Sequence, residues 1–159
     1  MEEFPHRLHH TTPGWVKEGA AFHIRIRVAP QQGVSLAEPT LAAELIAAAK
    51  RYHDLGKWRC DLFLIMPDHL HAMLIFPFYT DLTATTRDWK RGTARFQRVN
   101  WQDNFFDHRI RQRKERDETW HYIRMNPVAK GLCSDEDKWP WWWSGSLQSG
   151  GTCYANAAD

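Results

Sequence analysis

The chain has 159 residues, of which 43% are apolar and 25% are charged, and its formal net charge at pH 7 is +2. This length suits one domain with a sizeable hydrophobic core and is short for two. We find no apolar run long enough to span a bilayer and no signal-peptide core, so we expect a cytoplasmic protein without membrane attachment. Three cysteines without metal-ligand spacing indicate reduced thiols.

The first predicted element is a strand over residues 20–28, where apolar side chains alternate with polar and basic ones. Its polar side begins with His23, which we interpret as a surface residue, although it could approach a metal site. A helix is expected to begin at Pro39, because proline is favoured at the first helical position. It should end near Gly56, which can adopt the left-handed conformation of a helix C-terminus.

Two strands are predicted next, over residues 58–66 and 69–76, on either side of Pro67-Asp68. Side chains alternate faces along a strand, so His69 and His71 point to the same side. Two imidazoles on one face can bind a metal ion together. The alternative is that they cover a solvated face of the sheet, and a lone His-x-His pattern does not decide between the two.

Residues 83–99 are predicted to form a helix and residues 100–111 a final strand. Residues 87–116 carry ten basic side chains against four acidic ones, a local balance of +6. Such a stripe can neutralise phosphates, although charge runs more commonly form a solvated helix face. The stripe comes directly before the helix predicted to carry Tyr122, and this position favours DNA binding over a merely solvated helix face. The residues selected for DNA contacts are Lys90, Arg91, Arg95, Arg109, Arg111 and Arg113.

A second candidate site follows this basic stripe. Residues 114–119 are charged and polar without Gly or Pro, which predicts a helix through Tyr122 that Pro127 ends. Tyr122 and Asn126 then lie one helical turn apart on a shared face. The amide oxygen of Asn126 could complete a His-His-Asn metal site, with the phenol beside the ion. Ligands of this mix suit Mg²⁺ or Mn²⁺ better than a structural Zn²⁺.

Two further groups allow more than one interpretation. Asp107 and His108 lie in sequence between the two halves of the site; they could hold a proton or phosphate, support the ligands, or be structural. Residues 139–143 contain four tryptophans. Aromatic rings can stack on unpaired bases, but packing is favoured because large aromatics bury the most apolar area per residue.

The predicted order is strand, helix, strand, strand, helix, strand, followed by one more helix. This is the ferredoxin-like pattern of an α+β protein, an antiparallel sheet with helices on one face. The helix that carries Tyr122 follows the last strand.

Three segments carry a resemblance to a known family: Pro67-Asp68-His69-Leu70-His71, Phe105-Phe106-Asp107-His108-Arg109-Ile110-Arg111, and Tyr122-Ile123-Arg124-Met125-Asn126-Pro127-Val128-Ala129-Lys130-Gly131-Leu132. Together, in this order, they resemble the REP-associated tyrosine transposases, relatives of the single-tyrosine HUH transposases of small bacterial insertion sequences. The similarity runs from about residue 14 to residue 144. It implies the HUH nuclease fold, with metal ligands at His69, His71 and Asn126 and the nucleophile at Tyr122.

The resemblance also implies an activity, in which a bacterial, nucleoid-associated enzyme nicks single-stranded DNA and transfers the strand through a 5′-phosphotyrosine intermediate. Its cofactor would be Mg²⁺ or Mn²⁺, and its substrates would be the hairpins of repetitive extragenic palindromes. Two alternatives stay open: a hairpin-binding module of the same fold that no longer cuts, and a metal-dependent nuclease in which water attacks. A free phenol titrates near pH 10, so the nucleophile needs a metal or a base, and the sequence identifies no base.

The chain is expected to divide into a flexible N-terminus (1–13), a catalytic domain (14–144) and a flexible tail (145–159). Related transposases imply a monomer or a homodimer. Neither the DNA sequence recognised nor the origin of the nucleophile helix, from the same chain or from a partner copy, follows from the residues.

Overall fold

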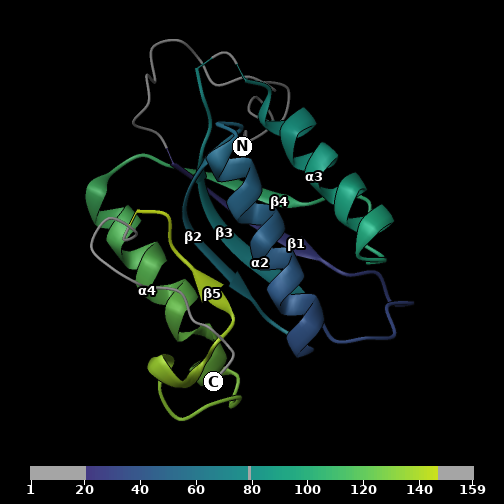
Figure 1. Cartoon of the computed structure of the whole chain (residues 1–159). Helices are drawn as coiled ribbons and strands as arrows, with labels where there is room; N and C mark the ends of the chain where they lie inside the picture. Colours follow the sequence, from purple (N-terminus) through teal and green to yellow (C-terminus); the bar gives the residue numbers. More distant parts are fainter. Residues whose placement is uncertain (1–20, 79, 147–159) are drawn as a thin grey trace.

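The computed structural model describes residues 21–78 and 80–146 (Figure 1). The predicted flexible N-terminus (1–13) and nearly all of the predicted flexible tail (145–159) lie outside the described residues. The elements in chain order are β1 (Ala21–Arg27), α2 (Pro39–Asp54), β2 (Arg59–Ile65), β3 (His69–Ile75), α3 (Leu82–Phe96), β4 (Phe106–Ile110), α4 (Arg113–Ala129), the 3₁₀ helix η2 (Glu136–Lys138) and β5 (Trp142–Trp143).

Within the described part of the chain, five antiparallel strands form one sheet in the order β4-β1-β3-β2-β5 (Figure 1). The first four strands with α2 and α3 give the ferredoxin-like order, with β1 and β3 at its centre. The predicted α+β fold is therefore confirmed. Strand β5 was not predicted, and it extends the sheet beyond β2.

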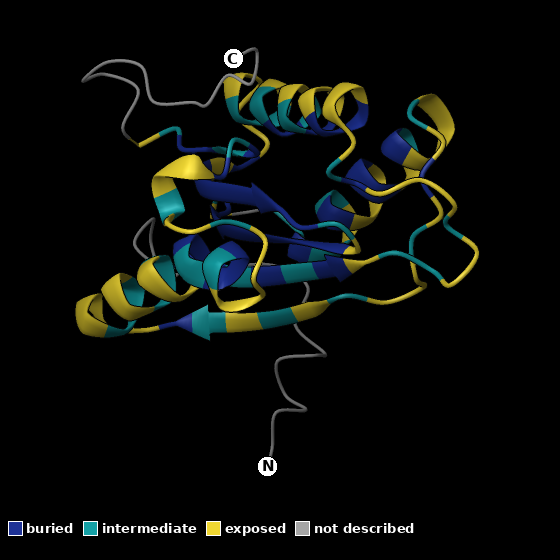
Figure 2. Ribbon diagram, turned by 90° about the horizontal axis from the view of Figure 1, so that it is seen from below, coloured by how far each residue is buried: buried dark blue, intermediate teal, exposed yellow. Residues whose placement is uncertain are grey.

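The two faces of the sheet are covered by different helices. Helices α2 and α3 pack on one face, and α4 lies over the other (Figure 2). On the first face, the rings of Phe63 in β2 and Trp89 in α3 are 5.7 Å apart. On the second face, the rings of His71 in β3 and Tyr122 in α4 are 5.9 Å apart. The alternation along β1 therefore sends its apolar side to the α2/α3 core and its polar side towards α4.

Helix α2 has the ends that its sequence predicts. Pro39 occupies the first turn, and the side chain of Glu38 accepts a hydrogen bond from the backbone N–H of Leu41 at 2.9 Å. At the other end Gly56 has a φ of +76°, and the N–H of Lys57 donates to the carbonyl oxygen of Tyr52 at 2.9 Å. These bonds satisfy the last carbonyl groups of the helix.

Helix α4 is longer than predicted. Pro127 lies inside it rather than at its end, so that prediction is wrong. Proline lacks an N–H, and the carbonyl group of Ile123 therefore loses its usual helical partner. Ile123 and Asn126 are both buried, and their packing holds the last turn. The helix ends instead at Ala129. Gly131, two residues later, has a φ of +75°, and the N–H of Leu132 donates to the carbonyl oxygen of Pro127 at 2.9 Å.

The final strand is shorter than predicted, since β4 covers only the second half of residues 100–111. Residues 100–105 form a loop that Trp101 joins to the sheet through a single bridge to Val28. The loop is fixed from beneath by Lys90 in α3, described below. Helix α3 itself continues through Gly92 without a break.

The tryptophan-rich segment, residues 139–143, packs onto the domain, which was the interpretation favoured over stacking on bases. Trp139, Trp141 and Trp143 are buried, and the indole N–H of Trp139 donates to the carbonyl oxygen of Ile65 at 3.0 Å. Trp142 is half-buried beneath the guanidinium group of Arg124, whose central carbon lies 4.0 Å from the ring centre. No helix in residues 21–78 and 80–146 is long and apolar enough to cross a bilayer.

Candidate active site

The candidate ligand histidines and the candidate nucleophile come together on the α4 face of the sheet. The rings of His69 and His71 have centroids 4.9 Å apart, and the ring of Tyr122 lies 5.9 Å from that of His71. Both histidines are buried, whereas 54% of Tyr122 is exposed. A strand-borne imidazole pair therefore lies beneath a phenol that a large substrate can reach.

Asn126 lies one turn after Tyr122, and only 5% of it is exposed. Its Oδ1 and the Nε2 of His71 are both buried without a hydrogen-bond partner. Buried polar atoms are almost always paired, because leaving one unpaired costs about 1–3 kcal/mol. These two atoms belong to two of the three predicted ligands. Both atoms can offer a lone pair to a divalent cation, so the chemistry of these side chains fits the predicted metal site.

The ligand set fits a hard, partly hydrated cation. No group of three His, Cys, Asp or Glu side chains in the described segments is placed to hold a metal ion. A site made by His69, His71 and Asn126 would thus depend on the amide oxygen and leave further positions to water and phosphate oxygens. Mg²⁺ and Mn²⁺ accept such surroundings, whereas structural Zn²⁺ prefers four protein ligands.

His23 also belongs to the site, and the interpretation of it as a surface residue is wrong. Its Nε2 lies 2.9 Å from Nδ1 of His71, and its ring lies 6.4 Å from that of Tyr122. The signal was present in the sequence. His23 is on the polar side of its strand, and the ferredoxin-like order places that strand beside the one that carries His71.

His69 has a partner of its own outside the ligand pair. Its Nδ1 lies 2.7 Å from Oδ1 of Asp68, the residue before it. The hydrogen bond with His69 is the main reason why the pKa of Asp68 is lowered. Asp68 is therefore a carboxylate at neutral pH, and it accepts a hydrogen bond from Nδ1–H of His69.

The three imidazoles are neutral at physiological pH. Burial, with further contributions from His23, His69 and Arg25, lowers the pKa of His71 to about 2. Burial likewise lowers the pKa of His23 to about 4. Burial also lowers the pKa of His69, against the opposing effect of Asp68. Only a neutral imidazole has a lone pair for a metal ion, so the protonation state of these rings is compatible with coordination.

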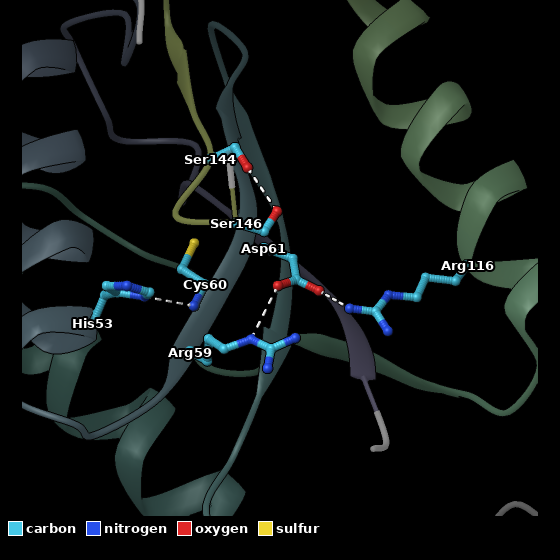
Figure 3. Close-up of polar contacts among 7 residues, drawn as sticks. All are labelled: His53, Arg59, Cys60, Asp61, Arg116, Ser144 and Ser146. Carbon is cyan, nitrogen blue, oxygen red and sulfur yellow. Dashed lines mark hydrogen bonds and ion pairs between the residues drawn. The ribbon is translucent and has the colours of Figure 1, made fainter. Parts of the chain in front are cut away.

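Charged side chains attach helix α4 to the sheet and to the 3₁₀ helix η2. Asp61 in β2 has only 3% of its side chain exposed, and its two oxygens bind Arg116 of α4 and Arg59 (Figure 3). Nearer the C-terminus of α4, the guanidinium group of Arg124 donates to the carbonyl oxygen of Glu136 at 3.2 Å. These contacts fix the helix on either side of Tyr122.

The side chains of Asp107 and His108 lie on opposite faces of the sheet. His108 pairs with His23 in the sheet and shares its face, and its Nε2 lies 2.6 Å from Oε2 of Glu115 in the first turn of α4. Asp107 pairs with Ile24 and points to the opposite, α2/α3 face. His108 is thus a link between β4 and α4, and Asp107 is not on the site's face.

The basic stripe of residues 87–116 does not form one surface. The helices that carry its two ends lie on opposite faces of the sheet, and Arg109 points away from the site with Phe22. Arg91, paired with Asp88, and Arg95 belong to α3. Arg111 and Arg113 instead line a hollow of about 470 Å³ at the start of α4.

Lys90 has a different role from the phosphate contact predicted for it. It is only 7% exposed, and its Nζ donates to the carbonyl oxygens of Gln102, Asp103 and Asn104 at 2.7, 3.2 and 3.2 Å. All three donors of the ammonium group are therefore engaged inside the protein. Lys90 fixes the loop before β4, and its ammonium group is not available to a phosphate.

A solved structure of a REP-associated tyrosine transposase bound to a REP hairpin is similar to this protein. The TM-score is 0.69, and the match covers 89% of this chain and 82% of that chain at 20% sequence identity. The two proteins share one fold. No family model matches the sequence, and no curated protein matches it.

Proposed function

We propose that this protein is a REP-associated tyrosine transposase that cuts and rejoins single-stranded DNA at hairpins. The observation that carries the proposal is the site itself: His69, His71 and Tyr122 converge, and two predicted ligand atoms, Nε2 of His71 and Oδ1 of Asn126, are buried and unpartnered. The fold shared with a hairpin-bound transposase supports the substrate class.

In the proposed reaction the phenol of Tyr122 loses its proton and its oxygen attacks the scissile phosphorus. The bond from phosphorus to the 3′-oxygen of the preceding nucleotide breaks, and that oxygen takes up a proton and leaves as a hydroxyl. A 5′-phosphotyrosine bond forms and keeps the energy of the broken phosphodiester, so a 3′-hydroxyl of another strand can reverse the step. A divalent cation held by His69, His71 and Asn126 would neutralise the charge that develops on the phosphate oxygens. The exposed position of Tyr122 gives the strand access to the nucleophile.

DNA binding is proposed to use basic residues on the site's own face. Arg25 and Arg27 are on the polar side of β1, next to His23, and Arg111 and Arg113 lie at the start of α4. Each phosphate that such residues neutralise makes binding weaker as salt rises. Hairpin affinity should therefore fall steeply between low and physiological salt.

The test uses a labelled single-stranded oligonucleotide that contains a palindromic hairpin with its flanking bases, incubated with Mn²⁺ or Mg²⁺. A covalent protein–DNA adduct should appear on a denaturing gel. It should be absent with Tyr122→Phe and present with the matched control Tyr52→Phe, since Tyr52 packs against Trp58 on the far side of the sheet. An adduct formed by Tyr122→Phe would contradict the nucleophile, and cleavage without any adduct would indicate attack by water.

Substitution of a site histidine can be compared with substitution of an exposed histidine on α4. His71→Ala should abolish cleavage and leave hairpin binding in place, because the ring is proposed to hold the cation needed for the reaction and not to contact the hairpin. The exposed His121, beside Tyr122 in sequence, should tolerate alanine in both assays. Binding without cleavage by the unsubstituted protein would instead favour a hairpin-binding module that no longer cuts.

A further inference from the structure

Each of the two proposed ligand histidines has one polar partner, and in both cases the partner is on Nδ1. Nδ1 of His69 lies 2.7 Å from the carboxylate of Asp68, and Nδ1 of His71 lies 2.9 Å from Nε2 of His23. A partner on Nδ1 determines which nitrogen of a neutral imidazole carries the proton, and thus which one has a free lone pair. For His69 the partner is an acceptor only, so Nδ1 donates and Nε2 holds the lone pair.

For His71 the partner is another imidazole, so the contact allows two arrangements. In the first, Nδ1–H of His71 donates to Nε2 of His23, and Nε2 of His71 is a bare lone pair. In the second, Nε2–H of His23 donates to Nδ1 of His71, and the proton of His71 is then on Nε2. The second arrangement prevents His71 from binding a cation through Nε2.

Burial distinguishes the two arrangements. Nε2 of His71 is buried and has no partner. The second arrangement would place an N–H there, and orphaned buried N–H groups are rarer in proteins than under-satisfied acceptors. The first arrangement moves the spare N–H to His23, which is only half-buried and can give it to water. It leaves at Nε2 of His71 a lone pair, which is what a metal ligand needs.

We infer that His23 is a positioning residue that holds His71 in the Nδ1–H form, so that its Nε2 is ready to bind the cation. The inference rests on the proposed function for the purpose of that lone pair, but the protonation pattern is a property of the protein alone. His23 therefore has the part for His71 that Asp68 has for His69.

The surroundings of His23 keep its ring in place for this task. β1 is central in the sheet, between β3 and β4. The ring makes an edge contact with that of Phe106 at 5.7 Å and another with Tyr122 at 6.4 Å. A phenylalanine at position 23 would preserve most of this ring packing but has no nitrogen to accept the N–H of His71. A glutamine would offer an amide oxygen near the place of Nε2.

The decisive measurement is a long-range ¹H–¹⁵N spectrum of the full chain without metal or DNA, assigned with a His71→Ala sample. In the unsubstituted protein Nδ1 of His71 should be the protonated, pyrrole-type nitrogen and Nε2 the pyridine-type one. In His23→Phe the proton should shift towards Nε2, and His23→Gln should restore the original pattern. Circular dichroism checks that each variant is folded.

Mn²⁺ binding followed by paramagnetic relaxation gives a second readout. Loss of a partner that orients a metal ligand typically weakens metal binding about 10- to 100-fold, and this is the expected effect of His23→Phe. His23→Gln should recover most of the affinity. A protonated Nε2 on His71 in the unsubstituted protein would overturn the inference, as would a His23→Phe variant with unchanged spectrum and unchanged Mn²⁺ affinity.

The two proposals fail separately. If the spectrum shows the Nδ1–H form and its dependence on residue 23, but no DNA adduct forms, the proposed function is wrong and the positioning of His71 stands. If adducts form through Tyr122 but residue 23 has no effect on His71 or on Mn²⁺, the function stands and this inference fails.

Discussion

Replacing Arg116 with methionine tests whether the ion pair on Asp61 holds the helix that carries Tyr122. The Asp61 side chain is 3% exposed, and that of Arg116 is 35% exposed. Removal of one partner of a buried pair leaves an uncompensated charge and costs about 3–5 kcal/mol. Arg59 stays as a second partner, with its Nε at 3.3 Å, so we expect a smaller loss of about 2–3 kcal/mol.

The loss is measurable by urea unfolding followed by tryptophan fluorescence. With a slope of about 2 kcal/mol per molar urea, Arg116→Met should lower the midpoint by roughly 1 M. The matched control is Glu118→Gln, which removes a pair with Lys114 at 3.7 Å whose side chains are 65% and 83% exposed. Exposed pairs one turn apart contribute about 0.3–0.5 kcal/mol, so this midpoint should barely move.

A double variant separates lost charge pairing from lost packing. Asp61→Asn combined with Arg116→Met removes the buried charge itself, and it should be less destabilised than the sum of the two single changes. An Arg116→Met midpoint no lower than that of Glu118→Gln would refute the reasoning. Destabilisation with an undiminished rate of adduct formation would show that the pair stabilises the fold without placing Tyr122.

Three more changes follow from single contacts. Lys90→Met leaves three carbonyl groups without their hydrogen-bond donor, and it should lower the free energy of unfolding by about 2 kcal/mol in a thermal or urea scan. The control Arg91→Met removes only an exposed ion pair and should lower it by under about 0.5 kcal/mol. The hydrogen bond with His108 lowers the pKa of Glu115 from 4.5, so its stabilisation is present at neutral pH and is lost as pH falls below the unfolded value. Glu115→Gln should therefore flatten the stability curve below about pH 5, by under about 1 kcal/mol because the carboxylate is partly exposed. Gly145→Ala would place its Cβ 2.6 Å from Cε1 of His53 and 2.7 Å from the carbonyl oxygen of Cys60, and should cost about 1–3 kcal/mol, while Gly33→Ala meets nothing within 4 Å and should be neutral in the same scan.

The fold was predictable because the local patterns agree with one another. Alternation along residues 20–28, Pro39 and Gly56 at the ends of a helix, and the two runs around Pro67-Asp68 each define an element without tertiary information. The boundary at Pro127 failed for a physical reason. From the sequence alone, a proline is expected to end a helix because it lacks the backbone N–H. In this protein the burial of Ile123 and Asn126 outweighs the lost hydrogen bond.

The candidate site was predictable only in part. His69, His71, Tyr122 and Asn126 follow from strand and helix periods together with the resemblance, and the structure brings the two histidines and the phenol together. Lys90 was misjudged, because sequence spacing cannot show that its ammonium group points inward to three carbonyl oxygens. The basic stripe was misjudged likewise, since neighbours in sequence lie on opposite faces of a sheet.

The position of the candidate nucleophile, Tyr122, depends on the helix rather than on the tyrosine itself. More than half of Tyr122 is exposed, so little packing energy holds its ring. The buried residues of α4 lie close after it, and the first turns of the helix are mostly exposed. What fixes those turns is polar: Arg116 on Asp61, and Glu115 on His108 and on the N–H of Arg111. Hydrogen bonds that involve a charged group are directional as well as strong, and apolar contacts are not directional. A helix attached by such bonds can keep an exposed phenol at a defined distance from the histidines while leaving its outer side open to a DNA strand.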